Sequence, residues 1–536
     1  MLKDQGAGYG QSRNFRGKIL LRFTVACTLI VSCNQSNPNA VMELQVDRFE
    51  PTWESLEKYE VPTWFCDAKF GIFIHWGVYS VPAFRSEWYP RLMYMDSAVW
   101  NAEFEVQREG PSSVYTHHVE KYGHPGKFGY KDFIHMFKAE QFDADGWMEV
   151  FKEAGAKYIV PVAEHHDAFA MYDSKYTRWN AVEMGPKRDV LKELFESARK
   201  MGLKVGASSH YAFNWSYFNR KPAFDNWNPE FFDLYGHNLE KNDHMDEKHL
   251  TNWWNRTTDI VDNYQPDIMW FDFYWDKEVF RPYHKKFAAY YYNKGLEWNK
   301  EVVLQGKNFG GFESFPGGTF LYDLERGKLA EIRKEPWQTD TSIGKNSWGY
   351  VSNWMSKTPN QLIDDLVDIV SKNGCLLLNV GPKADGTLPE DQVEVLLEIG
   401  KWLQINGQAI YGSRPWWIFG EGPTAVAAGH HTEGKNEDFT SEDFRFTTNK
   451  GKLYAILLEW PKSRELTIKS LGRNSEHGQW GIDKVRLLGH EGELIWEQNA
   501  DGLKVDLPQD LELDYAATLE IDFGAEGAKA IDNSID

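Results

Sequence analysis

The sequence predicts an α/β fold in which an irregular (β/α)8-like barrel over residues 51–411 is followed by an antiparallel β-sandwich over residues 412–524. Two observations support this. Short apolar strands alternate with helical patterns up to about residue 410, which is the order of a parallel sheet. Beyond residue 412, apolar and polar residues alternate between turn signals, which is typical of antiparallel sheets.

The predicted barrel strands are nearly continuous apolar runs, as expected of strands that are covered on both faces. They are Phe70–Gly77, Tyr158–His166, Lys204–Tyr211, Asp267–Phe273, Val302–Lys307, Pro336–Ser342 and Cys375–Gly381. This number of β–α units favours a closed barrel over an open sheet. Fewer than eight helices are clear, so we expect the barrel to be irregular.

Three barrel helices have readable boundaries. Two of them space apolar residues at about the helical period and end at Gly155 and Gly202. The third begins with Thr358 as N-cap and Pro359 at the first helical position, and it stops at Gly374.

The predicted sandwich strands lie within residues 443–460, 465–471, 483–489, 492–508 and 515–523. Clustered His, Asp or Glu residues are missing from their ends, so we expect the chemistry to lie in the barrel. Residues 525–536 are expected to form a frayed tail.

Composition narrows the classes of partner. The net charge of −20 argues against binding to a nucleic-acid backbone, which needs clustered Lys and Arg. Aromatic residues make up 15% of the chain and include 23 Trp. Such side chains combine a flat apolar face with a polar group, which suits sugar rings, although an aromatic-rich core is the alternative.

The first 33 residues have the pattern of a signal peptide, and residues 34–50 read as a tether. Basic residues precede or enter the apolar run ILLRFTVACTLIV: Arg13, Arg16, Lys18 and Arg22. The sequence IVSC resembles a bacterial lipobox, so we expect Cys33 to be lipidated. That anchor would hold the protein at the periplasmic or cell surface side of a membrane. An ordinary secretory signal is the alternative.

Two cysteines remain outside the predicted signal, Cys66 and Cys375. Both lie in apolar contexts without metal-binding spacing, so we expect buried free thiols. A disulfide between them stays open at this point.

Polar and titratable residues end five of the predicted barrel strands. They are His75; His165, His166 and Asp167; His210 and Tyr211; Trp270 and Asp272; and Lys307 with Asn308. In a (β/α)8 barrel the C-terminal strand ends share one face, where active sites lie. The sequence therefore predicts an active site there.

Two carboxylates in an aromatic-rich pocket indicate glycoside hydrolysis. The chain has no G-x-S-x-G elbow and no Gly-rich phosphate loop. Asp272 is expected to be one carboxylate of the pair. For the second, which we expect on a loop after a later strand, Glu325 is preferred over Glu331 and Glu335. The alternative for Glu325 is a solvated carboxylate paired with Arg326.

A metal centre is the competing hypothesis, because the chain is His-rich at residues 165–166 and 117–124. Adjacent His side chains on an extended strand point to opposite sides, so they can share one metal only where the strand has ended. We therefore expect neither a metal nor a cofactor, and a metal-dependent hydrolase stays the alternative.

Several long segments resemble one family, the α-L-fucosidases of glycoside hydrolase family 29. They are GIFIHWGVYSVPAFRSEWY, HHDAFAMYDS, PDIMWFD, SIGKNSWGY, NGCLLLNVGPKADGTLP and GKWLQINGQAIYG. The resemblance implies a retaining exo-hydrolase that removes terminal α-linked L-fucose from oligosaccharides or glycoconjugates. A non-catalytic glycan-binding protein on the same scaffold is the alternative. The oligomeric state stays undetermined.

The resemblance also implies roles for individual residues. Asp272 matches the nucleophile, and Glu325 lies where the acid/base is expected. Sugar-binding positions are matched by His75, Glu87, Trp88, His165, His166, Tyr211, Trp270 and Trp348. Lys307 stands where many family members have an Arg. A compact ammonium group therefore replaces a planar guanidinium group at this position. This departure leaves open the choice between L-fucose and the related L-galactose, and so an α-L-galactosidase.

Overall fold

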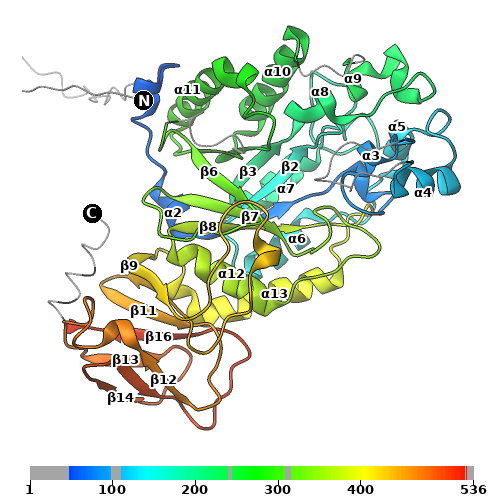
Figure 1. The fold of residues 1–536 in the computed structure, drawn as a ribbon. Helices are drawn as coiled ribbons and strands as arrows, with labels where there is room; N and C mark the ends of the chain where they lie inside the picture. Colours follow the sequence, from blue (N-terminus) through cyan, green and yellow to red (C-terminus); the bar gives the residue numbers. More distant parts are fainter. Residues whose placement is uncertain are drawn as a thin grey trace, which may run out of the picture. The chain divides into compact units, whose positions relative to one another are not determined.

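Eight parallel strands form a closed barrel in chain order, which confirms the predicted fold class (Figure 1). The strands are β1 Phe70–Ile74, β2 Tyr158–Glu164, β3 Lys204–Ser209, β4 Ile268–Phe271, β5 Val303–Lys307, β6 Leu321–Glu325, β7 Trp337–Ser342 and β8 Gly374–Val380. The barrel closes where β1 pairs with β8, with Phe70 opposite Leu376.

The structure is a computed structural model that describes residues 48–97, 110–238, 244–307 and 316–524, together with Gly527 and Ile531. The predicted signal peptide with Cys33, nearly all of the tether, Asn308 and most of the tail lie outside the described residues. The barrel and the C-terminal sheets belong to one compact unit, residues 48–536.

Strand β6 was not predicted from the sequence, and the placement of Glu325 on a loop was wrong. Glu325 is the last residue of β6, which pairs with β5 and β7 on either side. The segment LYDLE carries two carboxylates in five residues, so its sequence lacks the apolar run of a covered strand. Its Asp323 is nevertheless fully buried.

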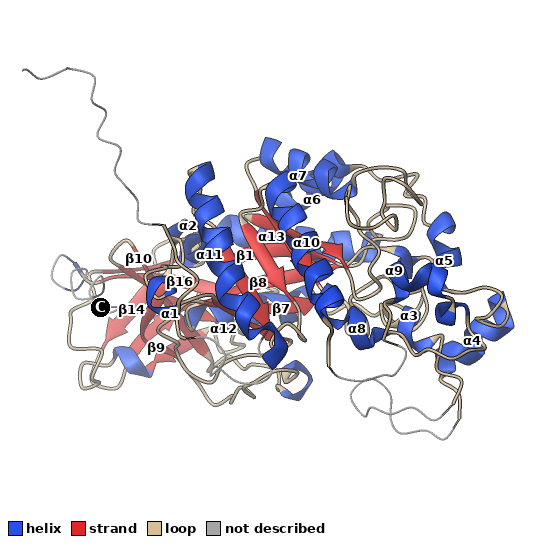
Figure 2. Ribbon diagram, turned by 90° about the horizontal axis from the view of Figure 1, so that it is seen from above, coloured by secondary structure: helices blue, strands red, loops and turns tan. Residues whose placement is uncertain are grey.

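Helices surround the strands, as the view in Figure 2 shows. They are α1 Trp53–Leu56, α2 Thr63–Ala68, α3 Tyr89–Leu92, α4 Ser113–Tyr122, α5 Tyr130–Phe133, α6 Ala144–Glu153, α7 Val190–Lys200, α8 Asn214–Tyr217, α9 Phe232–Tyr235, α10 Glu247–Tyr264, α11 Arg281–Trp298, α12 Pro359–Ser371 and α13 Glu390–Asn406. The barrel is irregular, as expected: residues 326–336, all described, connect β6 to β7 without an α-helix.

The three helices predicted from the sequence are present as α6, α7 and α12. Asp143 and Asp189 cap α6 and α7 by accepting hydrogen bonds from backbone N–H groups of the first turn. Thr358 caps α12, and the capping box that it forms with Gln361 satisfies the backbone N–H groups of both residues. Each cap typically stabilises a helix by about 1 kcal/mol.

The interior of the barrel is filled by one buried cluster that draws on strands around its circumference. Phe73, Val160, Trp270, Leu321 and Leu377 belong to this cluster. Full burial of each such side chain contributes about 1.5–3 kcal/mol. Because side chains fill the barrel, the open end above them is left for the site.

The C-terminal domain consists of two antiparallel sheets, as predicted. One has the order β13-β16-β11-β10-β9 and the other β12-β15-β14. The strands are β9 Arg414–Glu421, β10 Phe444–Asn449, β11 Lys452–Leu457, β12 Glu465–Ile468, β13 Lys484–Leu487, β14 Ile495–Gln498, β15 Leu503–Asp506 and β16 Ala517–Asp522. Strand β10 is joined to the barrel domain by Arg445, whose guanidinium donates to Asp368 of α12 at 2.6 Å.

Cys66 and Cys375 are free thiols, as expected. Burial raises the pKa of Cys375 to about 12, so this thiol stays protonated. Cys66 is only half-buried, which differs from the expectation. None of the helices in the described part of the chain is long and apolar enough to cross a membrane.

Candidate active site

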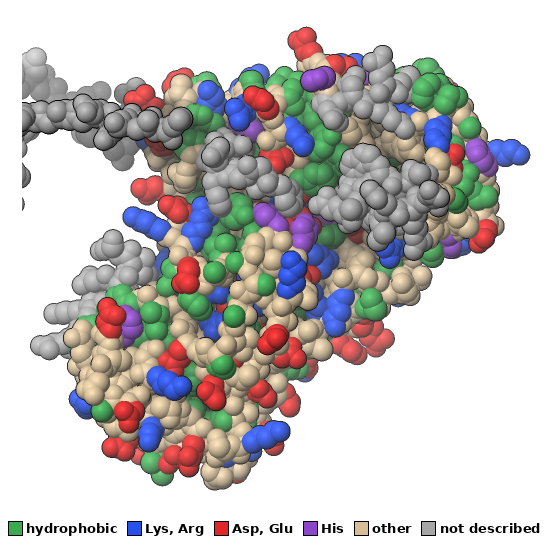
Figure 3. Space-filling view, in the orientation of Figure 1, with side chains coloured by type: hydrophobic (Ala, Val, Ile, Leu, Met, Phe, Trp, Pro, Cys, Tyr) green, Lys and Arg blue, Asp and Glu red, His purple; other side chains and the backbone are tan. Residues whose placement is uncertain are grey.

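A cavity of about 1150 Å³ lies at the C-terminal ends of the barrel strands. Most of the residues expected from the sequence line it: His75, Glu87, Trp88, His165, His166, Asp272, Lys307, Glu325 and Trp348. Figure 3 shows a group of His side chains near the middle of one face of the molecule, beside hydrophobic and positively charged side chains. The part of the lining expected from the sequence thus consists of imidazoles, indoles, carboxylates and the Lys307 ammonium.

Asp272 follows directly after β4 and is 6% exposed. Its Oδ2 accepts a hydrogen bond from His210 Nδ1 at 2.8 Å and lies 3.2 Å from His166 Nε2. Its Oδ1 accepts from the backbone N–H of Phe273 at 2.8 Å and lies 3.3 Å from Lys307 Nζ. Burial opposes the charge, but Lys307 and His210 outweigh it and hold the pKa of Asp272 well below its usual range.

Neutral imidazoles surround this carboxylate. Burial lowers the pKa of His210 to about 4, and it holds the pKa values of His75 and His165 well below the usual range. His210 donates from Nδ1 to Asp272 and contacts Ser208 Oγ through Nε2 at 3.0 Å. Neutral imidazoles can both donate to and accept from sugar hydroxyls.

Lys307 ends β5 and joins three carboxylates. Its Nζ lies 3.3 Å from Asp272 Oδ1, 2.7 Å from Glu325 Oε2 and 3.2 Å from Asp340 Oδ2. Burial opposes the ammonium charge, but Asp272 and Asp340 raise the pKa of Lys307 well above its usual value. The first two distances place the Asp272 and Glu325 oxygens no more than about 6 Å apart, which is compatible with the roughly 5–5.5 Å of retaining glycosidases.

Glu325 also lines the cavity, and its side chain is 13% exposed. Arg326 pairs with Glu433 at 2.6 Å, so the alternative pairing of Glu325 with Arg326 is not what the structure contains. Glu331 and Glu335 are exposed, and neither is among the residues that line the cavity. The geometry thus favours Glu325 among the three glutamates.

Glu87, Trp88 and Trp348 form part of the cavity wall. Glu87 is 3% exposed and accepts hydrogen bonds from the Trp348 backbone N–H at 2.9 Å and from Ser347 Oγ at 3.0 Å. Trp88 packs against His166, with ring centroids 5.3 Å apart. Glu87 therefore fixes the loop that carries Trp348.

Two residues expected to bind the sugar are not among those that line the cavity. Trp270 is fully buried in the barrel, where its Nε1 donates to Asp323 Oδ2 at 3.1 Å. Tyr211 stacks on His249 and lies under the Arg256 guanidinium, 4.4 Å from its ring centroid. The chain turns into a 3-10 helix at Tyr211, so His210 is the residue that reaches the cavity.

Sequence reasoning missed several residues around the two carboxylates. His210 was noted at a strand end but not assigned to the site, although that position was signal enough. Asp323 and Asp340 are buried within β6 and β7, and no sequence pattern indicated that they lie near the cavity. Arg326 was noticed only as a possible partner of Glu325, and His431 comes from the C-terminal domain.

Two groups of described residues have donor atoms close enough to hold a metal: His75, His165 and His210, and His166, His210 and Asp272. Strand β2 ends before His165, so the expected geometric obstacle does not apply there. However, both groups share His210, whose two ring nitrogens already contact Ser208 and Asp272. A metal would have to displace one of these contacts, so the donor set fits hydrogen bonding better.

A parallel barrel with two facing carboxylates in a buried, His-rich cavity defines a glycoside hydrolase. A family model described as Alpha-L-fucosidase matches residues 37–408, and one described as Alpha-L-fucosidase C-terminal domain matches residues 436–522. The chain belongs to the α-L-fucosidase family.

Relatives agree over nearly the whole chain. Human plasma α-L-fucosidase is 33% identical over 481 residues, covering 86% of this chain and 89% of that protein. Rat tissue α-L-fucosidase is 32% identical over 468 residues, with the same shares covered. The structure of Thermotoga maritima α-fucosidase in complex with fucose has a TM-score of 0.69 at 31% identity and covers 88% of this chain and 100% of that chain.

The role of Lys307 can be tested through the pH profile. Replacing it in the variant Lys307→Met removes the strongest charge that favours ionised Asp272, so the acid limb of kcat/KM should move to higher pH by about one unit or more. The measurement is kcat/KM for an aryl α-L-fucoside between pH 3 and 8. The variant Lys462→Met, at an exposed position of the C-terminal domain, is the control. An acid limb that stays in place would contradict the assigned role.

Proposed function

We propose that the protein is a retaining exo-α-L-fucosidase that removes terminal α-L-fucosyl residues from oligosaccharides or glycoconjugates. The observation that carries this proposal is the pair of carboxylates, Asp272 and Glu325, held by one ammonium at the mouth of the barrel. The similarity to human plasma α-L-fucosidase and to an α-fucosidase in complex with fucose supports this sugar and favours L-fucose over L-galactose.

In the first step, the Asp272 carboxylate attacks the anomeric carbon, and the glycosidic C–O bond breaks. Glu325 gives its proton to the departing oxygen, so it must be protonated when the substrate binds. In the second step, Glu325 takes a proton from water, and that water displaces Asp272 from the sugar. Two inversions at the same carbon retain its configuration.

The part of the cavity around Asp272 has groups that suit a sugar ring. The imidazoles of His75, His165 and His166 supply hydrogen-bonding groups, while Trp88 and Trp348 supply flat apolar faces. Burial of the methyl group of a 6-deoxy sugar against such faces contributes about 1 kcal/mol. A pocket of this kind favours release of terminal residues.

The nucleophile is tested with the variant Asp272→Ala. Turnover of an aryl α-L-fucoside should fall by about a thousandfold or more, because the covalent intermediate cannot form. Added azide should restore product, with inverted configuration, by entering the space of the missing carboxylate. Asp276→Asn changes another carboxylate that lines the cavity and is the control. Substantial activity in Asp272→Ala would reject Asp272 as the nucleophile. Sugar binding without turnover in the unchanged protein would instead favour a non-catalytic glycan-binding protein.

The acid/base is tested by leaving-group dependence. In Glu325→Ala, hydrolysis of an aryl fucoside with a good leaving group should fall far less than hydrolysis of a fucosylated oligosaccharide, since only the latter needs protonation. The ratio of the two kcat/KM values should change by about 10²-fold or more, the usual range of general acid catalysis. Glu331→Ala and Glu335→Ala are the matched controls. The same signature in either of them would transfer the role to that residue.

We also propose that Cys33 is lipidated and anchors the protein to a membrane surface on the periplasmic or outer side. The support is the sequence alone: a basic segment, a short apolar run and the lipobox-like IVSC. In a bacterial host, Cys33→Ala should move the protein from the membrane fraction to the soluble fraction and abolish incorporation of labelled palmitate. Unchanged fractionation and labelling would instead reject the anchor.

A further inference from the structure

A loop of the C-terminal domain runs back to the barrel and reaches the end of β6. This returning loop comprises residues 422–443, between β9 and β10. Its backbone pairs with the barrel: His431 N–H donates to the Glu325 carbonyl at 2.9 Å, and the N–H groups of Thr432 and Glu433 both donate to the Arg326 carbonyl at 3.0 Å. The returning loop therefore lies beside the expected acid/base residue.

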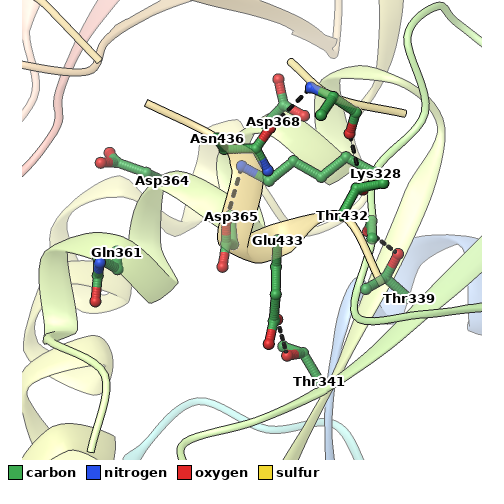
Figure 4. A network of polar contacts seen from close by, with 12 residues as sticks. Lys328, Thr339, Thr341, Gln361, Asp364, Asp365, Asp368, Thr432, Glu433 and Asn436 are labelled. Atoms are coloured by element: carbon green, nitrogen blue, oxygen red, sulfur yellow. Dashed lines mark hydrogen bonds and ion pairs between the residues drawn. The ribbon is translucent and has the colours of Figure 1, made fainter. Parts of the chain in front are cut away.

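Buried charges hold the returning loop in place. Glu433 pairs with Arg326 at 2.6 Å through one oxygen and with Lys357 at 2.6 Å through the other, which also accepts from Thr341. Burial opposes its charge, but the Arg326 and Lys357 cations hold the pKa of Glu433 at about 2. Figure 4 shows Glu433 directed toward Thr341 of β7. A pKa of about 2 keeps Glu433 ionised in neutral solution, as these pairs require.

A second set of contacts fixes the neighbouring part of the loop. Lys328 donates to Asp365 of α12 at 2.7 Å (Figure 4). The Lys328 carbonyl accepts from the Gly429 N–H at 2.9 Å. Thr432 Oγ1 donates to the carbonyl groups of Ala427 and Gly429. His430 and His431 lie between these two sets of contacts and are thereby held beside β6.

His430 bonds β6 at two points. Its Nδ1 accepts a hydrogen bond from the backbone N–H of Glu325 at 3.0 Å, so its Nε2 carries the proton and donates to Tyr322 Oη at 2.9 Å. Burial, with Lys307 nearby, lowers the pKa of His430 to about 4, while Glu325 raises it and His431 lowers it. A neutral imidazole at working pH keeps the acceptor that this contact needs.

His431 faces the cavity. It is among the lining residues, its side chain is 46% exposed, and its Nε2 lies 3.9 Å from Glu325 Oε2. An acid that protonates the departing oxygen lies on the leaving-group side of the sugar. His431 therefore lies where the group attached to the fucose must pass.

We propose that the returning loop is a working part of the active site. His430 is a positioning residue that holds Glu325 through its backbone, and His431 is a specificity-determining residue that hydrogen-bonds a hydroxyl of the leaving sugar. The inference rests on the proposed function, since it needs Glu325 as the acid.

The positioning role is tested with His430→Phe, which keeps the ring but removes the acceptor, and with His430→Asn, which restores an acceptor near Nδ1. In His430→Phe, kcat for a fucosylated oligosaccharide should fall about tenfold or more, and kcat for an aryl fucoside should fall less. The inhibition constant for free L-fucose should stay unchanged. The Asn variant should recover most of the loss. Equal losses on both substrates, or no rescue, would reduce His430 to a structural role.

The specificity role is tested with His431→Ala. For the oligosaccharide, kcat/KM should fall about tenfold, mainly through KM, which corresponds to one lost hydrogen bond. For the aryl fucoside it should stay within about twofold of the unchanged enzyme. The variant His490→Ala, in the turn after β13, is the matched control from the same domain. Equal effects on both substrates, or no effect, would overturn the proposal.

The two levels of inference can fail separately. If Glu325→Ala loses equal activity on the aryl fucoside and on the oligosaccharide, Glu325 is not the acid/base. The positioning role of His430 then fails with it. If Glu325→Ala has the leaving-group signature while the His430 and His431 variants behave like His490→Ala, only the role of the returning loop fails.

Discussion

The site depends on one buried ammonium among carboxylates. Lys307 is 4% exposed, and an unpaired charge at such a depth would cost several kcal/mol. Asp272, Glu325 and Asp340 offset this cost by lying within 3.3 Å of Nζ. Because the same cation lies within 3.3 Å of an oxygen of Asp272 and of Glu325, it holds these two carboxyl groups close together.

One ammonium cannot neutralise all of the acids around it. Burial and the neighbouring Asp323 carboxylate raise the pKa of Asp340 well above its usual range, so Asp340 ionises less readily than Asp272. Asp272 has more stabilising partners, since His210 and the Phe273 N–H also donate to it, and it stays ionised. The unequal surroundings of these two buried acids thus favour the negative charge on Asp272, the proposed nucleophile.

The two domains meet at the end of β6, where His431 N–H donates to the Glu325 carbonyl, as well as at α12, where Arg445 pairs with Asp368. No α-helix lies in the described connection between β6 and β7. The returning loop instead bonds the start of this connection. The ion pairs of Glu433 with Arg326 and Lys357 tie this loop to the barrel, and Arg326 also stacks on Trp348 at 4.6 Å. The C-terminal sheets thereby act on the cavity without contributing a strand to the barrel.

The sequence by itself determined the parts of the structure that depend on local patterns. Apolar runs marked seven of the eight barrel strands, caps such as Thr358 marked helix ends, and PDIMWFD placed Asp272 at the end of a buried strand. Only the tertiary structure decided that LYDLE is a strand, that Tyr211 packs on His249 instead of facing the cavity, and that His430 and His431 reach Glu325. Capping and strand burial are set by residues a few positions apart in the chain. Which polar side chains converge is set by closure of the barrel and by contacts across more than a hundred residues, which no local pattern encodes.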